Sequence, residues 1–537
     1  MSLSVKYMDI PVGAQEAAVA EATVAQPFGS AELLTVGAED MPWATLEPGS
    51  WALDGSRVLM DDAPQNIGWW SMERTDENGR FGKPPVITVS FPQPYTATGI
   101  TFTFWPSMGQ WCDAVEVTWY NGQTVLAQTK AEPDSAKWVL ARVVEGFDRI
   151  EIALLGTNKP MQFAKLQNIQ IGQVVIFLQD ELVRVNLLNE MDPSLCQMSA
   201  DTMTVEVLEK KDRYLMPQKN QSMYLYRDGV QIATQYITDS SRENQRFYTF
   251  RCQSAIGRLE DDFFGGIYNA YPLDTLLEAV LDGFQADWTA FAGKTVTGYL
   301  PVCTRREALQ QIAFAMGAAV TTQGDGTIRL TPVEDICKEV GSFEDHSIFS
   351  GAKVSREAQT AAVRLLVHSY GVGGDTETLL NEEEIEGEDV LYVFSSPHYD
   401  YQITNGSVTG SGVNWVRITA NSKVTLTARK YVHSTSVRAK TNALATAAER
   451  GNVVTVENAT LVHAGNADVV LDRLYAYHTL KNVLTQDVVV TDQRAGGYVR
   501  SPNPWGTVTE GYITAMESEF TNSGHTAGVT IRGKEEV

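Results

Sequence analysis

The sequence predicts a mainly β protein of several domains, in which a β-sandwich precedes a region of mixed β and α+β structure. Short strand-forming runs recur over residues 85–172 with turn signals and no helical pattern between them, which is typical of a sandwich. Residues 222–330 contain strand patterns, a glycine turn and a capped helix. A chain of 537 residues is too long for one core and is expected to form roughly three to five domains.

The first third supplies the strands of the sandwich. Asn121-Gly122 is a hairpin signal between two of them. The residues before Trp51 are ambiguous: 14–26 reads as helix or strand, and 1–46 as an arm docked on a neighbour or as the first strands of the sandwich. The expected strands cover 85–91, 99–104, 114–120, 124–128, 137–143, 149–155 and 164–172.

Three phrases in this region resemble the discoidin-like, or galactose-binding-like, jelly roll. They are Leu53-Asp-Gly55, Gly68-Trp-Trp-Ser71 and Thr98-Gly-Ile-Thr-Phe-Thr-Phe104, and the resemblance covers about 47–172. Members of that group often bind sugars or lipid head groups with loops at one end. Some hold a structural calcium at the place of Asp54, so the resemblance makes Asp54 the candidate calcium ligand.

The tryptophans of this region include two candidate ligand contacts. We expect Trp70 and Trp119 in the core, the first from the resemblance and the second from its strand. Trp105 and Trp111 flank the loop 106–110. Because a sugar face stacks on an exposed indole, these two are the candidate ligand-binding residues. A purely structural role is the alternative.

The central part looks like a scaffold. Asp228-Gly229 joins two strand patterns, and a third strand is expected over 247–252. Thr304-Arg-Arg-Glu307 is a capping box that begins a helix ending near Gly317. A further helix is expected over 273–281, and a hairpin over 320–330. Local pattern alone describes a small α+β domain without a site.

The last third is expected to be β-rich around one helix at 467–481. Asn421-Ser422 is read as a turn between two strands. The acidic run 381–389 is read as a solvated loop, in preference to the paired carboxylates of a glycosidase. The expected strands are 413–420, 423–432, 452–459, 486–491, 507–517 and 527–531.

From about residue 174 onward, several phrases look like the tail-hub proteins of phages. They include Leu187-Leu-Asn-Glu190, Arg227-Asp-Gly229, Ser254-Ala-Ile-Gly-Arg-Leu259, Thr304-Arg-Arg-Glu-Ala-Leu309 and, in the C-terminal part, Gly528-Val-Thr-Ile-Arg-Gly533. The resemblance implies a homotrimer with hub-like β-barrel and tube-forming domains that closes the tail tube. Its partners would be the distal tail protein, other tail-tip proteins and the tape-measure protein. The resulting domain boundaries are 1–46, 47–173, 174–262, 263–335 and 336–537.

Composition agrees with such a role. The chain has 42 basic and 66 acidic residues, a net charge of −24. This argues against specific nucleic-acid binding as the main function, whereas an acidic channel that repels phosphate suits a conduit for DNA. An acidic soluble protein without that role explains the charge equally well.

The cysteines and the N-terminus indicate folding in a cytoplasm, which the resemblance to tail hubs implies is that of a host bacterium. The five cysteines are far apart and have no CxxC spacing, which predicts neither zinc nor a disulfide framework. Met1–Tyr7 lacks a secretory pattern. Because no apolar run approaches about 18 residues, we expect no transmembrane segment.

We therefore predict a structural phage or prophage tail-tip or baseplate hub, located in the virion, that contributes to host attachment and DNA passage. We expect no enzyme, because no G-x-S-x-G, HExxH, P-loop or G-x-G-x-x-G helix start is present. The seven histidines are scattered without metal-ligand spacing. The sandwich would bind neighbouring tail proteins or a cell-surface glycan. The alternatives are a carbohydrate-binding cell-surface protein unrelated to tails and an unrecognised glycoside hydrolase.

Overall fold

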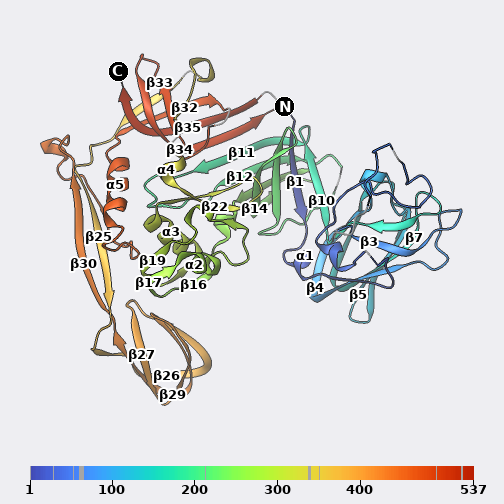
Figure 1. The fold of residues 1–537 in the computed structure, drawn as a ribbon, viewed down its shortest axis with the longest axis horizontal. Helices are drawn as coiled ribbons and strands as arrows, with labels where there is room; N and C mark the ends of the chain where they lie inside the picture. Colours follow the sequence, from blue (N-terminus) through green and yellow to red (C-terminus); the bar gives the residue numbers. More distant parts are fainter. Residues whose placement is uncertain are drawn as a thin grey trace.

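The computed structural model describes residues 2–27, 29–52, 54–59, 66–211, 213–336, 340–349, 351–490, 493–521 and 524–536. The protein is mainly β, as predicted, with a few short helices. Three parts are visible in Figure 1: a sandwich at one end, a central frame, and a smaller projecting module. Within the described ranges no sheet closes into a barrel, and no helix there has the length and apolarity needed to cross a membrane.

The frame is built on a 13-stranded sheet whose strands come from both ends of the chain. β11 pairs with β34, so residues near 185 and near 520 share one antiparallel ladder. The path through the sheet is β10 (Gln173–Leu178), β1 (Leu3–Asp9), β13 (Ser222–Arg227), β14 (Val230–Arg242), β15 (Phe247–Gln253), β12 (Thr202–Leu208), β11 (Leu182–Glu190), β34 (Val508–Thr521), β35 (Gly524–Glu536), β32 (Asn482–Val489) and β24 (Lys353–Arg356). β33 (Tyr498–Pro502) pairs with β34, and β23 (Val340–Ser342) pairs with β33.

The sandwich is an insertion into this frame. β1 and β10 are antiparallel neighbours, with Asp9 opposite Gln173, so the intervening chain leaves and re-enters at one place. The two crossing backbones touch there: a Cβ on Gly172, which has φ +147°, would lie 2.2 Å from the carbonyl oxygen of Asp9. The ambiguity of residues 1–46 is thereby resolved into two parts. β1 belongs to the frame, and β2 (Val19–Ala22) pairs with β4 of the sandwich.

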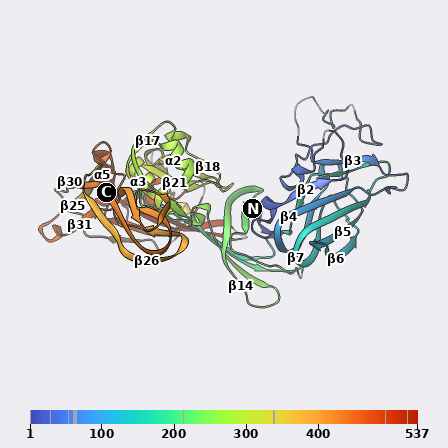
Figure 2. The same cartoon turned by 90° about the horizontal axis from the view of Figure 1, so that it is seen from below.

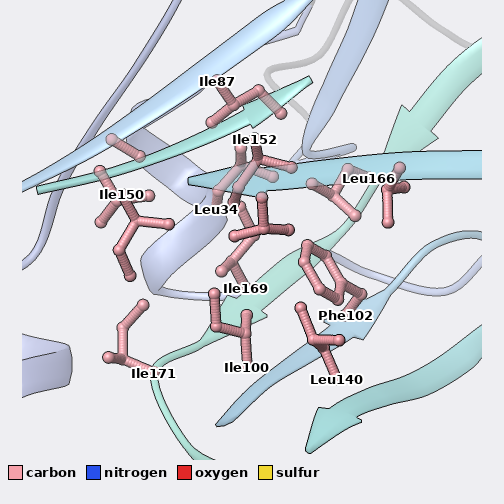
Figure 3. Close-up of a cluster of buried hydrophobic side chains, with 14 of the residues drawn as sticks. Leu34, Ile87, Ile100, Phe102, Leu140, Ile150, Ile152, Leu166, Ile169 and Ile171 are labelled. Carbon is pink, nitrogen blue, oxygen red and sulfur yellow. The ribbon is translucent and has the colours of Figure 1, made fainter. Parts of the chain in front are cut away.

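Two sheets make the sandwich. Alternating apolar residues of β4 and β7 point into one core, shown in Figure 3 with Ile87, Ile100, Phe102, Ile150 and Ile152. The strands expected at 85–91 and 99–104 form the single long strand β4, and those expected at 137–143 and 149–155 form β7. Register shifts in the β4–β7 ladder accommodate the bends between the expected strands. The elements are α1 (Ala14–Ala17), β3 (Trp69–Arg74), β4 (Val86–Thr103), β5 (Ala114–Asn121), β6 (Thr124–Ala131), β7 (Lys137–Gly156), β8 (Phe163–Leu166) and β9 (Asn168–Gln170).

An α+β unit lies beside the frame, and its predicted local signals are confirmed. Thr304 and Glu307 form the capping box of α3 (Arg305–Met316), and Gly317 ends the helix with φ +71°. α2 (Leu273–Val280) packs into the same core as α3. The other elements are β16 (Asp262–Phe264), β17 (Ile267–Pro272), β18 (Ala286–Asp287), β19 (Thr295–Tyr299), β20 (Val302–Thr304), β21 (Ala318–Thr322), β22 (Ile328–Pro332) and α4 (Val333–Ile336).

The projecting module is a second insertion. β25 (Ala362–Gly371) and β30 (Val432–Thr441) pair along their whole length and form its neck, against which α5 (Ala467–His478) packs. β31 (Val453–Val456) lies on the other side of β25. The module consists of β26 (Thr376–Val393), β27 (His398–Thr404), β28 (Ser407–Ser411) and β29 (Trp415–Lys430).

Two predictions in this module are wrong. The acidic run is part of the strand β26, and Asn421-Ser422 lies inside β29 instead of forming a turn. The ladder between the two long strands overrides the local turn signals. Glu382 and Asp389 adopt φ +51° and +61° at register shifts, so the turn-like residues of the run serve β-bulges.

Candidate functional site at the loop end of the sandwich

The two candidate tryptophans are packed into the sandwich. Trp105 is only 2% exposed, its Nε1 donates to the carbonyl oxygen of Met41 at 2.7 Å, and its ring centroid lies 4.8 Å from that of Trp70. Trp111 is half-buried, and its Nε1 donates to the carbonyl oxygen of Pro133 at 3.0 Å. Both indole N–H groups are thus satisfied within the protein. Their role in ligand binding stays a prediction, whereas the core positions of Trp70 and Trp119 are confirmed.

Lys165 and Glu47 form a buried ion pair beside the rings of Trp70 and Trp105. The Lys165 ammonium donates to the Glu47 carboxylate and, at 2.6 Å, to Gln110 Oε1. It also lies 4.9 Å from the ring centroid of Trp70 and 4.7 Å from that of Trp105, within cation–π distance. The side chains of Lys165 and Glu47 are almost completely excluded from solvent. Trp70 and Trp105 therefore pack around Lys165, a lysine of the protein itself.

Glu47 has further partners that compensate its burial. Its carboxylate accepts hydrogen bonds from the Phe163 backbone N–H and from the Thr45 hydroxyl, each at 2.7 Å. Burial lowers the pKa of Lys165 to about 8, although the Glu47 charge acts to raise it. Since the pair joins the loop that contains Thr45 and Glu47 to β8, it fixes the base of that loop on the sandwich.

The surface of the same loop presents large apolar side chains to solvent. The segment closes on itself where Ala44 N–H donates to the carbonyl oxygen of Val58 at 2.7 Å. Trp51 is 51% exposed, and Leu46 and Leu59 are also exposed. An exposed indole on an anchored loop can stack on a sugar ring or insert among apolar groups. Sequence reasoning placed Trp51 only at a boundary, although a tryptophan directly after the turn-forming Pro48-Gly-Ser50 was a usable signal.

Asp54 lies in this loop, near residues that the structure does not describe. Its Oδ1 accepts hydrogen bonds from the backbone N–H of Ser56 at 3.0 Å and from the Ser56 hydroxyl at 2.5 Å. These bonds lower the pKa of Asp54. In the described part of the chain, no three His, Cys, Asp or Glu side chains are grouped to hold a metal ion. Calcium at Asp54 stays an expectation.

The structure also joins two histidines that sequence reasoning regarded as scattered. His368 of β25 and His433 of β30 lie on one face of the neck, with Nδ1 of the first 2.9 Å from Nε2 of the second. Burial lowers the pKa of His368, and the neighbouring His433 lowers it further. Because 65 residues separate the two in sequence, only the pairing of the strands reveals them.

Comparisons with known proteins show weak similarity in fold alone. No family model matches the sequence, and no curated protein is significantly similar to it. The 43 kDa tail protein of a Shewanella oneidensis prophage is 12% identical with a TM-score of 0.40, over 66% of this chain and 95% of that one. A Neisseria meningitidis tail protein is 10% identical (TM-score 0.40, 67% and 94% coverage). A Listeria monocytogenes prophage tail protein is 11% identical (TM-score 0.39, 67% and 92%). At TM-scores below 0.5 these similarities assign neither family nor function to this chain.

Proposed function

We propose that this protein is a structural, non-catalytic component of a phage or prophage tail, where three copies form the hub that closes the tail tube. The observation that supports assembly most directly is the free edge of β30. This strand pairs with β25 on one side, and no described strand pairs with its other side. Figure 1 shows it along the outer margin of the molecule.

The side chains of β30 are exposed along almost its entire length. Val432 and Val437, at 58% and 60% exposed, are the large apolar ones among them. A ten-residue strand with an unpaired edge and apolar side chains is a template for another strand. Proteins usually protect such an edge, so a partner that covers it is the simplest explanation.

The proposed partner is a second copy of this chain. A contact between the β30 edge of one copy and a different surface of the next is heterologous, and such contacts close into a ring when the rotation permits. The resemblance of residues 174–537 to tail hubs favours three copies. The net charge of −24 suits a passage that lets DNA through without binding it. The distal tail protein and the tape-measure protein would contact the two ends of the ring.

The sandwich would then face away from the ring. It lies at the opposite end of the molecule from the neck and the projecting module, as Figures 1 and 2 show. Its exposed loop with Trp51 is suited to contact a cell-surface glycan or a neighbouring tail protein. This arrangement separates assembly from attachment within one chain.

The mass of the protein by light scattering tests the assembly. We expect a trimer for the natural chain and a monomer for the Val432→Lys/Val437→Lys variant, because two ammonium groups at the edge oppose strand addition. Val469→Lys is the matched control, since Val469 is equally exposed but lies on α5. A natural chain that is monomeric at every concentration, or a variant that still assembles, would contradict the proposal.

A carbohydrate-binding protein unrelated to tails is the second candidate, and the exposure of Trp51 favours it. We expect Trp51→Ala to weaken binding to cell-wall fractions by about 1–3 kcal/mol if its ring stacks on the ligand, by analogy with aromatic stacking on bases. Trp505→Ala is the control, because Trp505 is equally exposed but lies in the frame. Glycan binding by a monomer would favour this candidate. Unchanged affinity in Trp51→Ala would show that Trp51 does not contact the glycan in either proposed function.

A further inference from the structure

The buried ion pair of the sandwich has a third member, the side-chain amide of Gln110. The Lys165 ammonium donates to Gln110 Oε1 at 2.6 Å and also contacts the Glu47 carboxylate. Lys165, Glu47 and Gln110 are 4%, 3% and 6% exposed. Because a C=O bond is about 1.2 Å long, Nζ of Lys165 lies within about 4 Å of Cδ of Gln110. An amine, a carboxylate and a primary amide are thus held together away from water.

The amide of Gln110 is held in this orientation from its other end. Its Nε2 donates to Gln162 Oε1 at 2.8 Å and to the Ser50 hydroxyl at 3.3 Å. Gln162 and Ser50 are themselves buried, and Gln162 Nε2 donates to the carbonyl oxygen of Pro48 at 2.9 Å. These hydrogen bonds direct the carbonyl of the Gln110 amide toward Lys165.

We propose that the side chains of Lys165 and Gln110 join in an intramolecular isopeptide bond, with Glu47 as the proton carrier. The neutral Lys165 amine attacks Cδ of Gln110, and a bond between Nζ and Cδ forms. Glu47 accepts one proton from Nζ and delivers it to Nε2 of Gln110. The bond between Cδ and Nε2 then breaks, and ammonia leaves. The product is a secondary amide, and no oxidant, reductant or other reactant takes part.

The surroundings of Lys165 favour the neutral amine that this reaction requires. Burial lowers the pKa of Lys165 to about 8, although the Glu47 charge acts to raise it. The positive charges of Lys159 and Arg74 act in the same direction as burial. The nearby Cys112 thiol stays neutral, because burial raises its pKa. The neutral amine is therefore the minor form at pH 6 and the main form at pH 9.

The bond would close the loop end of the sandwich covalently. Lys165 lies on β8, and Gln110 ends the loop that follows Trp105. Groups held next to each other react far faster than the same groups free in solution. Like a disulfide, the cross-link would restrict the unfolded chain and so stabilise this end of the sandwich. The inference concerns the sandwich alone and does not depend on the proposed trimer.

The mass of the denatured full-length protein, measured after the folded protein has been incubated at pH 6 and at pH 9, tests the bond. We expect a form to accumulate that is lighter by one ammonia molecule. Its rate should be on the order of a hundredfold higher at pH 9, in proportion to the neutral amine. Because asparagine residues can also lose ammonia, tandem mass spectrometry of a digest must find the peptides of Gln110 and Lys165 linked.

Gln110→Met is the matched control, because it keeps the Lys165–Glu47 pair and a side chain of similar size but has no amide at this position. It should keep its full mass. Glu47→Gln removes the proton carrier and should slow the reaction by about 10²–10⁴-fold, with tryptophan fluorescence to confirm that this variant is folded. A natural chain that keeps its full mass at both pH values, or a loss of ammonia without the linked peptides, would overturn the proposal. An equal rate in folded Glu47→Gln would overturn the role of Glu47.

Discussion

The two inserted parts of the molecule, the sandwich and the projecting module, differ in how they are stabilised. The core of the sandwich extends over both of its sheets. A smaller buried cluster beside it, which includes Trp70 and Trp105, packs against the buried Lys165–Glu47 ion pair. The fully buried apolar core of the projecting module has six residues. Its ion pairs, such as Arg417–Asp389, are largely exposed. Because the module buries little apolar surface, its order depends more on its attachment to the frame and on whatever covers it in an assembly.

The connections of the two inserted parts to the frame also differ in length. The sandwich is joined by a six-residue antiparallel pairing of β1 with β10, whereas the module continues from the ten-residue pairing of β25 with β30. A self-sufficient domain needs only a short connection, whereas a module with a small core gains from a long ladder that holds both of its ends. The sandwich is thus suited to independent binding and the module to assembly.

The largest effect should come from breaking the buried ion pair of the sandwich. We expect Glu47→Ala to lower the free energy of unfolding of the sandwich by about 3–5 kcal/mol, because it leaves the Lys165 ammonium buried without its partner. Chemical denaturation followed by tryptophan fluorescence measures this. Arg80→Ala, which breaks the exposed Arg80–Asp113 pair, is the control and should cost no more than about 1 kcal/mol. Equal losses of stability in the two variants would contradict a special role for the buried pair.

The next effect is a dependence on alkaline pH. Burial lowers the pKa of Lys165 to about 8 from 10.5. Between these values the unfolded chain binds more protons than the folded one, so stability rises with pH across this window and is lost as pH falls through about 8. The rise should be on the order of 3 kcal/mol.

The double variant Glu47→Gln/Lys165→Met is the comparison for this window. It removes both charges and keeps similar volumes, so it should fold with nearly natural stability at pH 7.5. Denaturation of both proteins at pH 7.5 and pH 10 gives the difference. The natural chain should gain stability relative to the variant, and parallel pH profiles would show that Lys165 does not titrate in this range.

The smallest effect on stability should come from the acidic strand of the projecting module. Glu383, Glu384 and Glu386 are exposed on β26, which pairs with β29 on one side only. Changing all three to Gln should alter the free energy of unfolding by no more than about 0.5 kcal/mol per site. Self-association measured by sedimentation should increase, since charges on an edge strand oppose unintended pairing. Glu278→Gln on α2 is the control. Unchanged self-association of the triple variant would show that these charges do not prevent pairing at the edge of β26.

Signals between near neighbours in sequence predicted the structure well. The capping box of Thr304 and Glu307 depends on residues three apart, and Asp228-Gly229 takes φ +50° and +80° as a hairpin turn of this type requires. Both are set by local backbone sterics and hydrogen bonds. Asn421-Ser422 shows the limit: its turn signal is just as local, but a long partner strand decides its conformation.

Contacts between distant residues could not be predicted. Glu47 and Lys165 are 118 residues apart, and nothing near either one indicates its partner. The same holds for His368 and His433, and for the pairing of β1 with β10 that makes the sandwich an insertion. The sequence placed Trp105 and Trp111 beside a loop, but whether an indole faces inward or outward depends on packing that spacing does not encode. Trp105, which the sequence suggested as an exposed ligand contact, is buried, whereas Trp51, to which the sequence gave no role, is exposed.

Particle images of the purified protein, taken on the fraction whose mass has been measured, test the central claim most directly. The account predicts a ring of three copies with a central opening, in which β30 lies at the contact between neighbours and the sandwiches project outward. Single molecules at every concentration, or an assembly in which the edge of β30 faces solvent, would contradict it.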